Sequence, residues 1–134
     1  MHIQWNEFTL PIEKITVSWM KATLSKRGLI SINRAAFRAM AQPSHVVLLY
    51  DTVNFLIGLR PAGSHIKNAM RVRRRRDAQS TYQISAKNFC NYYGIALPCS
   101  LQFNNLKPTE DGTLILDLRT ATEIVRAPRA KKFY

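Results

Sequence analysis

The sequence is poor in the features that define several large classes of protein. No segment approaches the ~20 consecutive apolar residues that a membrane-spanning helix needs. The first residues lack the basic and apolar regions of a secretory signal. The two cysteines lie too far apart for a zinc knuckle, and the three histidines lie at no ligand spacing near them. We therefore expect a cytoplasmic protein with no metal, no other cofactor and no membrane partner.

Sequence motifs of catalysis are also absent. The chain has no phosphate-binding loop, no Gly-rich dinucleotide turn, no zinc-protease motif and no serine-nucleophile motif. Most of the acids that could form a paired-carboxylate site fall in predicted turns or a strand: Asp51, Asp77, Asp111 and Asp117. We expect that the protein is not an enzyme. Convergence of distant carboxylates into a nuclease site is the alternative. Cys90 and Cys99 are expected to be buried free thiols.

What the sequence has in excess is positive charge. Twenty Lys and Arg stand against eight Asp and Glu, which gives a net charge of +12. Between Lys14 and Arg76 there are thirteen basic residues, and Asp51 is the one acid. A charge of this size attracts polyanions or anionic membrane surfaces, although it says nothing about fold. It favours a nucleic-acid partner over a merely solvated surface.

The chain contains two similar stretches 52 residues apart, 28–40 and 80–92. Each alternates apolar and polar residues, reaches a polar residue (Asn33 or Ser85), and continues with the apolar spacing of a helix. Both stretches therefore predict a short strand, a polar N-cap and a short amphipathic helix. With 134 residues and 46% hydrophobic composition, the two halves can form a compact core without disulfides.

The similarity extends on both sides of these stretches. Each unit is preceded by a predicted strand and followed by a predicted hairpin and a Leu-Arg-x-Ala end. The preceding strands are 15–24 and 69–74, the hairpins are 46–59 and 101–118, and the ends are 59–62 and 118–121. This pattern divides the chain into an N-terminal extension (1–13), a first repeat (14–62), a linker (63–68), a second repeat (69–121) and a basic C-terminal tail (122–134).

The segment KATLSKRGLISIN, residues 21–33, resembles the AbrB/SpoVT/MazE-type swapped-hairpin superfamily, in which a strand, a Gly-Arg turn and a short strand lead into a helix. It departs from that pattern at Leu29, where Arg is usual, and at Asn33, where Pro is usual. Asn33 can cap a helix in place of the proline. Two copies in one chain resemble the tandem arrangement of MraZ proteins.

The resemblance implies a mainly β fold with short α-helices. Two strand–loop–strand–helix–hairpin repeats would form one pseudo-symmetric swapped-hairpin barrel, because a single unit is too small to bury its apolar face. The resemblance also implies a DNA-binding transcriptional regulator, associated with the nucleoid. Exchange of hairpins with a second chain, which would give a homo-oligomer, is an open alternative.

The strongest chemical feature is the run RVRRRR, residues 71–76. Successive side chains of a strand face opposite sides, so this run cannot be buried on either face and should be an exposed ribbon or loop. Guanidinium groups match phosphate oxygens bidentately. The alternative is a basic linker with non-specific affinity for nucleic acid.

A second basic group lies in the turn and helix of the first repeat, and the resemblance places it on the same DNA-facing side. The candidate nucleic-acid contacts are Lys26, Arg27, Arg34, Arg38, Lys67, Arg71, Arg73, Arg74, Arg75, Arg76 and Lys87. The aromatic residues are assigned to the core and not to base stacking: Trp5, Trp19, Phe37, Tyr50, Phe55, Phe89, Tyr92, Tyr93 and Phe103.

The favoured function is therefore double-stranded DNA binding through a basic loop and helix face. One alternative is a protein-binding module, antitoxin-like or a phage-encoded inhibitor, whose basic patch meets an acidic partner. Another is an RNA-associated structural protein. This alternative is less favoured than duplex DNA binding, because no strand interleaves aromatic with basic residues.

Overall fold

The protein is built mainly of β-strands arranged in two sheets. The computed structural model describes residues 20–75, 81–103 and 106–124. The six-stranded sheet contains, in order, β10 (Thr122–Ile124), β8 (Ser100–Phe103), β1 (Ala22–Leu24), β2 (Leu29–Ile32), β7 (Thr81–Ser85) and β6 (Arg73–Arg75). The four-stranded sheet contains β5 (Ala69–Arg71), β3 (His45–Asp51), β4 (Leu56–Ala62) and β9 (Leu114–Asp117). The helices are α2 (Arg34–Ala39) and α3 (Lys87–Tyr93).

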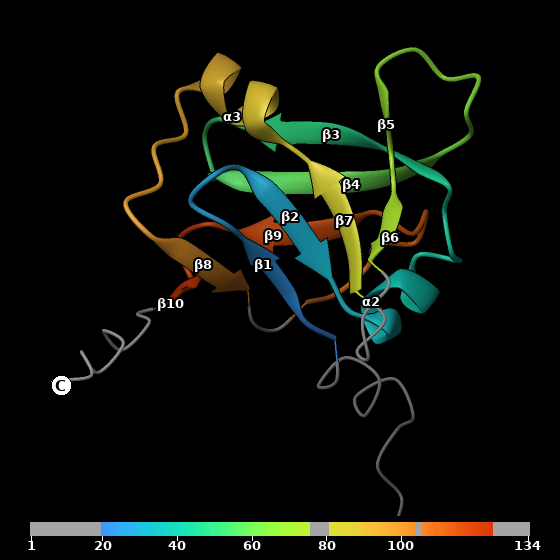
Figure 1. Ribbon diagram of the computed structural model, residues 1–134, viewed down its shortest axis with the longest axis horizontal. Helices are drawn as coiled ribbons and strands as arrows, with labels where there is room; N and C mark the ends of the chain where they lie inside the picture. The colour runs from blue at the N-terminus through green and yellow to red at the C-terminus, as the bar shows by residue number, and fades with distance from the viewer. Residues whose placement is uncertain (1–19, 76–80, 104–105, 125–134) are drawn as a thin grey trace, which may run out of the picture.

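The two sheets stack as layers whose strands cross (Figure 1). Strand alternation points one side chain in two toward the space between the sheets. From the six-stranded sheet these are residues such as Leu24, Ile30 and Ile84, and from the four-stranded sheet residues such as Ile57 and Leu116, all fully buried. The alternating apolar pattern of the sequence thus forms one core between two sheets.

The prediction of a mainly β fold with short helices is confirmed, but the prediction of a single barrel is wrong for the described strands. These strands form two open sheets. On one side the sheets are joined at a corner, because Val72 alone separates β5 from β6, and its N–H donates to the Ser44 carbonyl at 2.9 Å. On the other side β10 and β9 are edges that do not pair with each other.

The hairpin predicted for the second repeat does not form. β8 pairs with β1 and β10, whereas β9 pairs with β4 in the other sheet. Ten residues separate β8 from β9, and Pro108, within that connection, forms only an isolated bridge to Leu114. The longer connection lets the two strands enter different sheets, which a hairpin of the first repeat's length would not allow.

Strand pairing joins the two halves of the chain at their equivalent residues. The 52-residue offset aligns Ser31 with Gln83, and these two residues lie opposite each other in the β2–β7 pair. The Leu-Arg-x-Ala ends align Ile57 with Leu116, and these also lie opposite each other in the β4–β9 pair. Antiparallel pairing of equivalent residues defines a local two-fold axis, so each of these two strand pairs has one.

The helix ends agree with the sequence only in part. The Asn33 side chain accepts a hydrogen bond from the Ala36 N–H at 3.0 Å, so Asn33 caps α2 as predicted. Ser85 was expected to cap α3 in the same way, but Ser85 ends β7. The N-cap is Ala86, which has no side-chain bond to offer. Gly94 closes α3 in the left-handed conformation, with φ 65°.

The aromatic residues are not all in the core. Phe103 is buried, and Phe37, Tyr50 and Phe89 pack partly buried against the core. Tyr92, Phe55 and Tyr93 are 82%, 48% and 41% exposed, so the core assignment was wrong for these three. Adjacent positions on a helix point about 100° apart, so Tyr92 and Tyr93 cannot both face the core. Trp5 and Trp19 lie outside the described residues.

Several predicted segments cannot be compared with the structure. The N-terminal extension, the first part of the strand predicted at 15–24, and the tail beyond residue 124 lie outside the described residues. The strand predicted at 69–74 is present, but the corner at Val72 divides it into β5 and β6. The predicted linker, 63–68, is the turn that carries the chain from β4 to β5.

Candidate nucleic-acid interface

The arginine run forms an exposed edge of the six-stranded sheet. β6 pairs with β7 on one side only, and Arg73, Arg74 and Arg75 are all exposed. Arg71, at the end of β5, is exposed as well. The sequence-based prediction of an exposed ribbon is therefore confirmed for these four residues, while Arg76 lies outside the described part. An edge strand suits such a run, because charged side chains there also prevent pairing with another chain.

Lys26, Arg27 and Lys87 are brought together by a close backbone approach between the two halves. The β1–β2 turn contains Gly28, whose carbonyl accepts a hydrogen bond from the Ala86 N–H at 2.8 Å. This bond holds the turn against the start of α3, so the basic residues beside Gly28 and at the helix start share one surface. All three basic side chains are exposed, and none has an ion pair with a described carboxylate.

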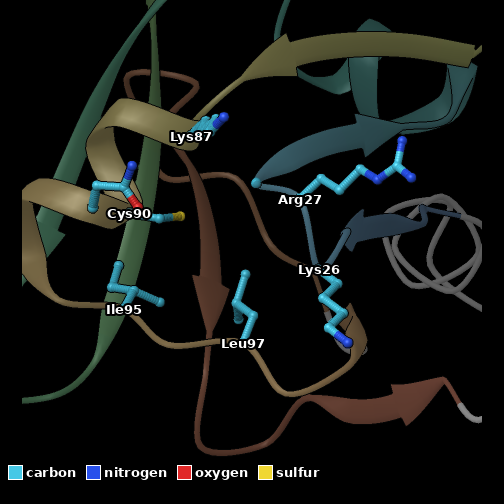
Figure 2. A pocket seen from close by; sticks show the side chains of 8 residues that line it. Lys26, Arg27, Lys87, Cys90, Ile95 and Leu97 are labelled. Atoms are coloured by element: carbon cyan, nitrogen blue, oxygen red, sulfur yellow. The ribbon is translucent and has the colours of Figure 1, made fainter.

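A hollow of about 580 Å³ lies between the β1–β2 turn and α3 (Figure 2). Its apolar lining includes Cys90, Ile95 and Leu97. Figure 2 shows the sulfur of Cys90 directed toward the hollow, while the charged ends of Lys26 and Arg27 extend away from Cys90. The cations therefore occupy the rim of this hollow and are available to a ligand that lies across it.

A second, smaller hollow of about 290 Å³ adjoins the arginine edge. It is lined by Leu29, Met70, Arg71, Arg73, Gln83 and Ser85. Leu29 follows Gly28 directly and pairs with Ser85, which lies two residues before Lys87. The two hollows therefore share one end of the β2–β7 pair. Sequence analysis missed Leu29, Gln83 and Ser85, because strand alternation alone did not show which uncharged residues would border the arginines.

The structure divides the other predicted contacts into separate places. Arg34 and Arg38 lie on α2, which begins where β2 ends, so they are at the opposite end of that strand from Arg27. β6 runs along the edge between the two ends, and its Arg74 lies opposite Tyr82, whose ring stacks on Phe37 of α2. Lys67 lies in the turn before β5. The residues predicted to share one face therefore form a band that runs from the β1–β2 turn and the start of α3, along β6, to α2.

The described carboxylates lie on elements other than those of this band. The described carboxylates are Asp51, Glu110, Asp111, Asp117 and Glu123, and none of them lies on β1, β2, β6, β7, α2 or α3. Glu123 lies on β10, the edge opposite to β6. Asp117 forms an ion pair with Arg119, with Oδ1 and Nε 3.6 Å apart. The two edges of the six-stranded sheet thus differ in charge: β6, called the basic edge below, carries Arg73, Arg74 and Arg75, whereas β10 carries Glu123.

Two of the acids have roles within turns, as the sequence predicts. The Asp51 carboxylate accepts hydrogen bonds from the Asn54 side chain and from the Asn54 and Val53 N–H groups, and these bonds lower its pKa. The Asp111 carboxylate accepts from the Thr109 and Thr113 hydroxyls and from the Thr113 N–H, which lowers its pKa in the same way. Hydrogen bonds to the charged form have this effect in general.

Both cysteines are free thiols, in different surroundings. Cys90 is buried on α3, and burial raises its pKa. Cys99 is only half-buried, contrary to the prediction, and its pKa is raised by desolvation and by the nearby Glu123 carboxylate. In residues 20–75, 81–103 and 106–124, no three His, Cys, Asp or Glu side chains gather as metal ligands. The two helices of the described part are too short and too polar to cross a bilayer.

Comparisons with known proteins add no relative to this description. No family model matches the chain, and no curated protein sequence and no solved structure is significantly similar to it. The function is therefore argued from the surface itself.

Proposed function

We propose that the protein binds double-stranded DNA along its basic edge and acts as a transcriptional regulator. The observation that carries the proposal is β6, an edge strand of consecutive exposed arginines with no carboxylate on the elements beside it. Buried arginines would suggest a structural role, whereas arginines exposed at a sheet edge, such as Arg73 and Arg74, can turn toward phosphates.

Phosphate contacts from this edge would supply most of the affinity. Arg73 and Arg75 lie on β6, and Arg71 lies on β5 across the corner at Val72. Arg27 and Lys87 line the larger hollow at the end of the β2–β7 pair. Cations that neutralise phosphates release condensed counterions, so binding should weaken steeply as salt rises. For six phosphates, the slope of log K against log salt would be about −5.

The arrangement of the two halves supports the resemblance to swapped-hairpin proteins. Each half pairs its strands with the other half, since β1 pairs with β8, β2 with β7, β3 with β5 and β4 with β9. We propose that this interlocking is the tandem, single-chain form of the swapped-hairpin arrangement. The resemblance, and with it the regulatory role, is part of the proposal.

The proposal is tested by fluorescence anisotropy of a random-sequence duplex at several salt concentrations. The variant Arg73→Ser/Arg74→Ser/Arg75→Ser removes three charges from the basic edge. The control Arg60→Ser/Lys107→Ser/Arg119→Ser removes three exposed charges from other elements. We expect the first variant to bind at least roughly tenfold more weakly at 0.1 M salt, with a slope smaller by about 3. Equal weakening by the control, or no binding by the wild type at low salt, would contradict the proposal.

One observation favours a protein-binding module as the second candidate. Tyr92 and Tyr93 contact each other with ring centroids 4.9 Å apart, and both are exposed. Exposed aromatic residues are enriched where proteins bind one another. Under this alternative the basic edge would meet an acidic partner. Binding to that partner would then withstand competition by duplex DNA, which the DNA-binding proposal does not allow.

A further inference from the structure

Polar side chains form a row across the outer face of the six-stranded sheet. Ile30, Ile32 and Ile84 are buried between the sheets, so the residues that alternate with them face outward. The strand registers place the following outward residues side by side, from one edge to the other: Thr122, Gln102, Thr23, Ser31, Gln83 and Arg73. None of the six is acidic or aromatic, so the row is a surface of hydrogen-bonding groups.

The two ends of this row differ. At the β6 edge, Arg73 lies directly opposite Gln83, and both border the small hollow together with Ser85 and Leu29. At the other end, Gln102 lies on β8, beside the β10 strand that carries Glu123. The β6 end therefore combines a glutamine with positive charge, while at the other end Gln102 lies between Thr122 and Thr23 and has no charged neighbour in the row.

The side chains at the β6 end are not used within the protein. Neither Gln83 nor Arg73 makes a side-chain hydrogen bond or ion pair with another described residue. Gln83 is half-buried, so its amide position is restricted by its neighbours, whereas Arg73 is exposed. A half-buried amide with both its donor and its acceptor unused can accept and donate at once.

We propose that the β6–β7 edge enters the major groove of duplex DNA and that Arg73 and Gln83 contact base edges there. The inference rests on the proposed function and adds the residues that would give it sequence preference. Paired strands can enter the major groove, and β6–β7 is the outermost strand pair of the six-stranded sheet, with the free side of β6 at the edge (Figure 1).

The residue types indicate which bases would be read. Arg forms bidentate hydrogen bonds with guanine, and Gln forms them with adenine. The apolar side chains of Leu29 and Met70, which line the same hollow, can contact the methyl group of thymine. Arg71 also borders the hollow and would hold a flanking phosphate. The edge should thus prefer a site in which guanine and adenine occupy neighbouring positions.

The test begins with selection of preferred sites from randomised duplexes by the wild-type protein. The affinity for the selected duplex and for a scrambled duplex is then measured for Gln83→Ala, Arg73→Lys and the control Gln102→Ala. We expect Gln83→Ala to lose roughly 5- to 150-fold in affinity for the selected duplex and nothing for the scrambled one. Arg73→Lys should behave similarly, because it keeps the charge but loses the bidentate geometry. Gln102→Ala should change neither affinity.

The outcomes separate this inference from the proposal on which it rests. If the wild type selects no sequence but binds all duplexes with a steep salt dependence, the β6–β7 readout is overturned and DNA binding stands. If it binds no duplex at low salt, both fail. Loss of affinity for both duplexes in Gln83→Ala, or an equal loss in Gln102→Ala, also overturns the readout. Thermal unfolding of each variant shows whether it is folded. If Gln83→Ala does not fold, Arg73→Lys still tests the readout.

Discussion

Gly28 occupies the position where the backbones of the two halves come closest. Its φ of +86° lies in the left-handed region, which side chains strongly disfavour. A Cβ atom at this position would lie 2.8 Å from the Cα of Lys87, a contact with backbone that cannot rotate away. Gly94 also has a positive φ, 65°, but a Cβ there would meet nothing within 4 Å. A side chain at Gly94 would therefore meet only conformational strain, whereas one at Gly28 would also meet steric overlap.

We expect Gly28→Ala to destabilise the protein by at least about 2 kcal/mol, because strain and steric overlap add. Gly94→Ala should cost about 1 kcal/mol, the conformational cost alone. Urea unfolding followed by circular dichroism measures both. Gly28→Ala should also weaken DNA binding, because the turn places Lys26 and Arg27 beside Lys87. Equal destabilisation by the two substitutions would show that the approach to Lys87 is unimportant.

Residue-scale predictions from sequence succeeded where the chemistry is local. The cap bond of Asn33 and the turn bonds of Asp51 reach residues at most three positions away, so a local pattern was enough to predict both roles. Ser85 fails the same test, because α3 starts one residue later than α2 relative to the repeat alignment. The Ala86 N–H instead donates to Gly28 of the other half, which no local pattern could indicate.

At the scale of elements, α2 is fixed to the β7 strand by an aromatic stack. The rings of Phe37 and Tyr82 lie nearly parallel, 10° apart in orientation, with centroids 3.8 Å apart. Phe37 comes from the first half and Tyr82 from the second, so this contact crosses between the halves as the strand pairs do. Stacked aromatic pairs contribute beyond the area they bury.

A double-mutant cycle with Phe37→Leu and Tyr82→Leu should therefore give a coupling free energy of about 0.5–1.5 kcal/mol. The control cycle combines Phe37→Leu with Tyr92→Leu. Tyr92 lies on α3, which Figure 1 shows at the far side of the molecule from α2, so the two changes should add within about 0.5 kcal/mol. Chemical denaturation measures all five variants. Additivity in the Phe37–Tyr82 cycle would remove the stack as a link between the halves.

Element-scale prediction from sequence was limited by pairing. The existence of β2, α2, β7 and α3 follows from periodicity, and the structure contains each of them. Periodicity does not state which strand a strand pairs with. The sequence therefore assigned β8 and β9 to one hairpin, whereas a ten-residue connection places them in different sheets. The exposure of β6 was predictable, because consecutive arginines cannot be buried on either face, but its position at the edge of a sheet and not in a loop was not.

At the scale of the whole molecule, the two repeats are similar in their strand pairing but differ in their charge. The β2–β7 and β4–β9 pairs each join equivalent residues of the two repeats. The first strand of one repeat is β1, which lies inside the sheet between β8 and β2. Its counterpart β6 lies at an edge and carries the arginines. Duplication followed by divergence of one edge would give a single basic edge on a nearly symmetric fold.

The candidate site was predicted from sequence in its charged members and not in its geometry. Exposed arginines and the basic turn could be named from charge and alternation alone. The placement of Arg34 and Arg38 at the other end of β2 from Arg27, and the closeness of Gly28 to Lys87, depend on pairing between distant strands. Gln83 and Ser85 gave no signal of their own, because an uncharged polar residue on a strand ordinarily faces solvent without a further role.

The interlocking of the halves makes a direct prediction about folding. Both sheets contain strands of both halves, so neither half can complete a sheet alone. The core side chains of the two halves are buried together. Fragments 1–66 and 67–134, cut in the turn between β4 and β5, should each lack a stable fold, because a half-sized unit with open edges buries too little apolar surface. Mixed in equal amounts, they should recover the β circular dichroism and the cooperative unfolding of the intact chain. A cooperative unfolding transition in either fragment alone would show instead that the repeats fold independently. The strand pairs between the halves would then be a docking interface between two folded units.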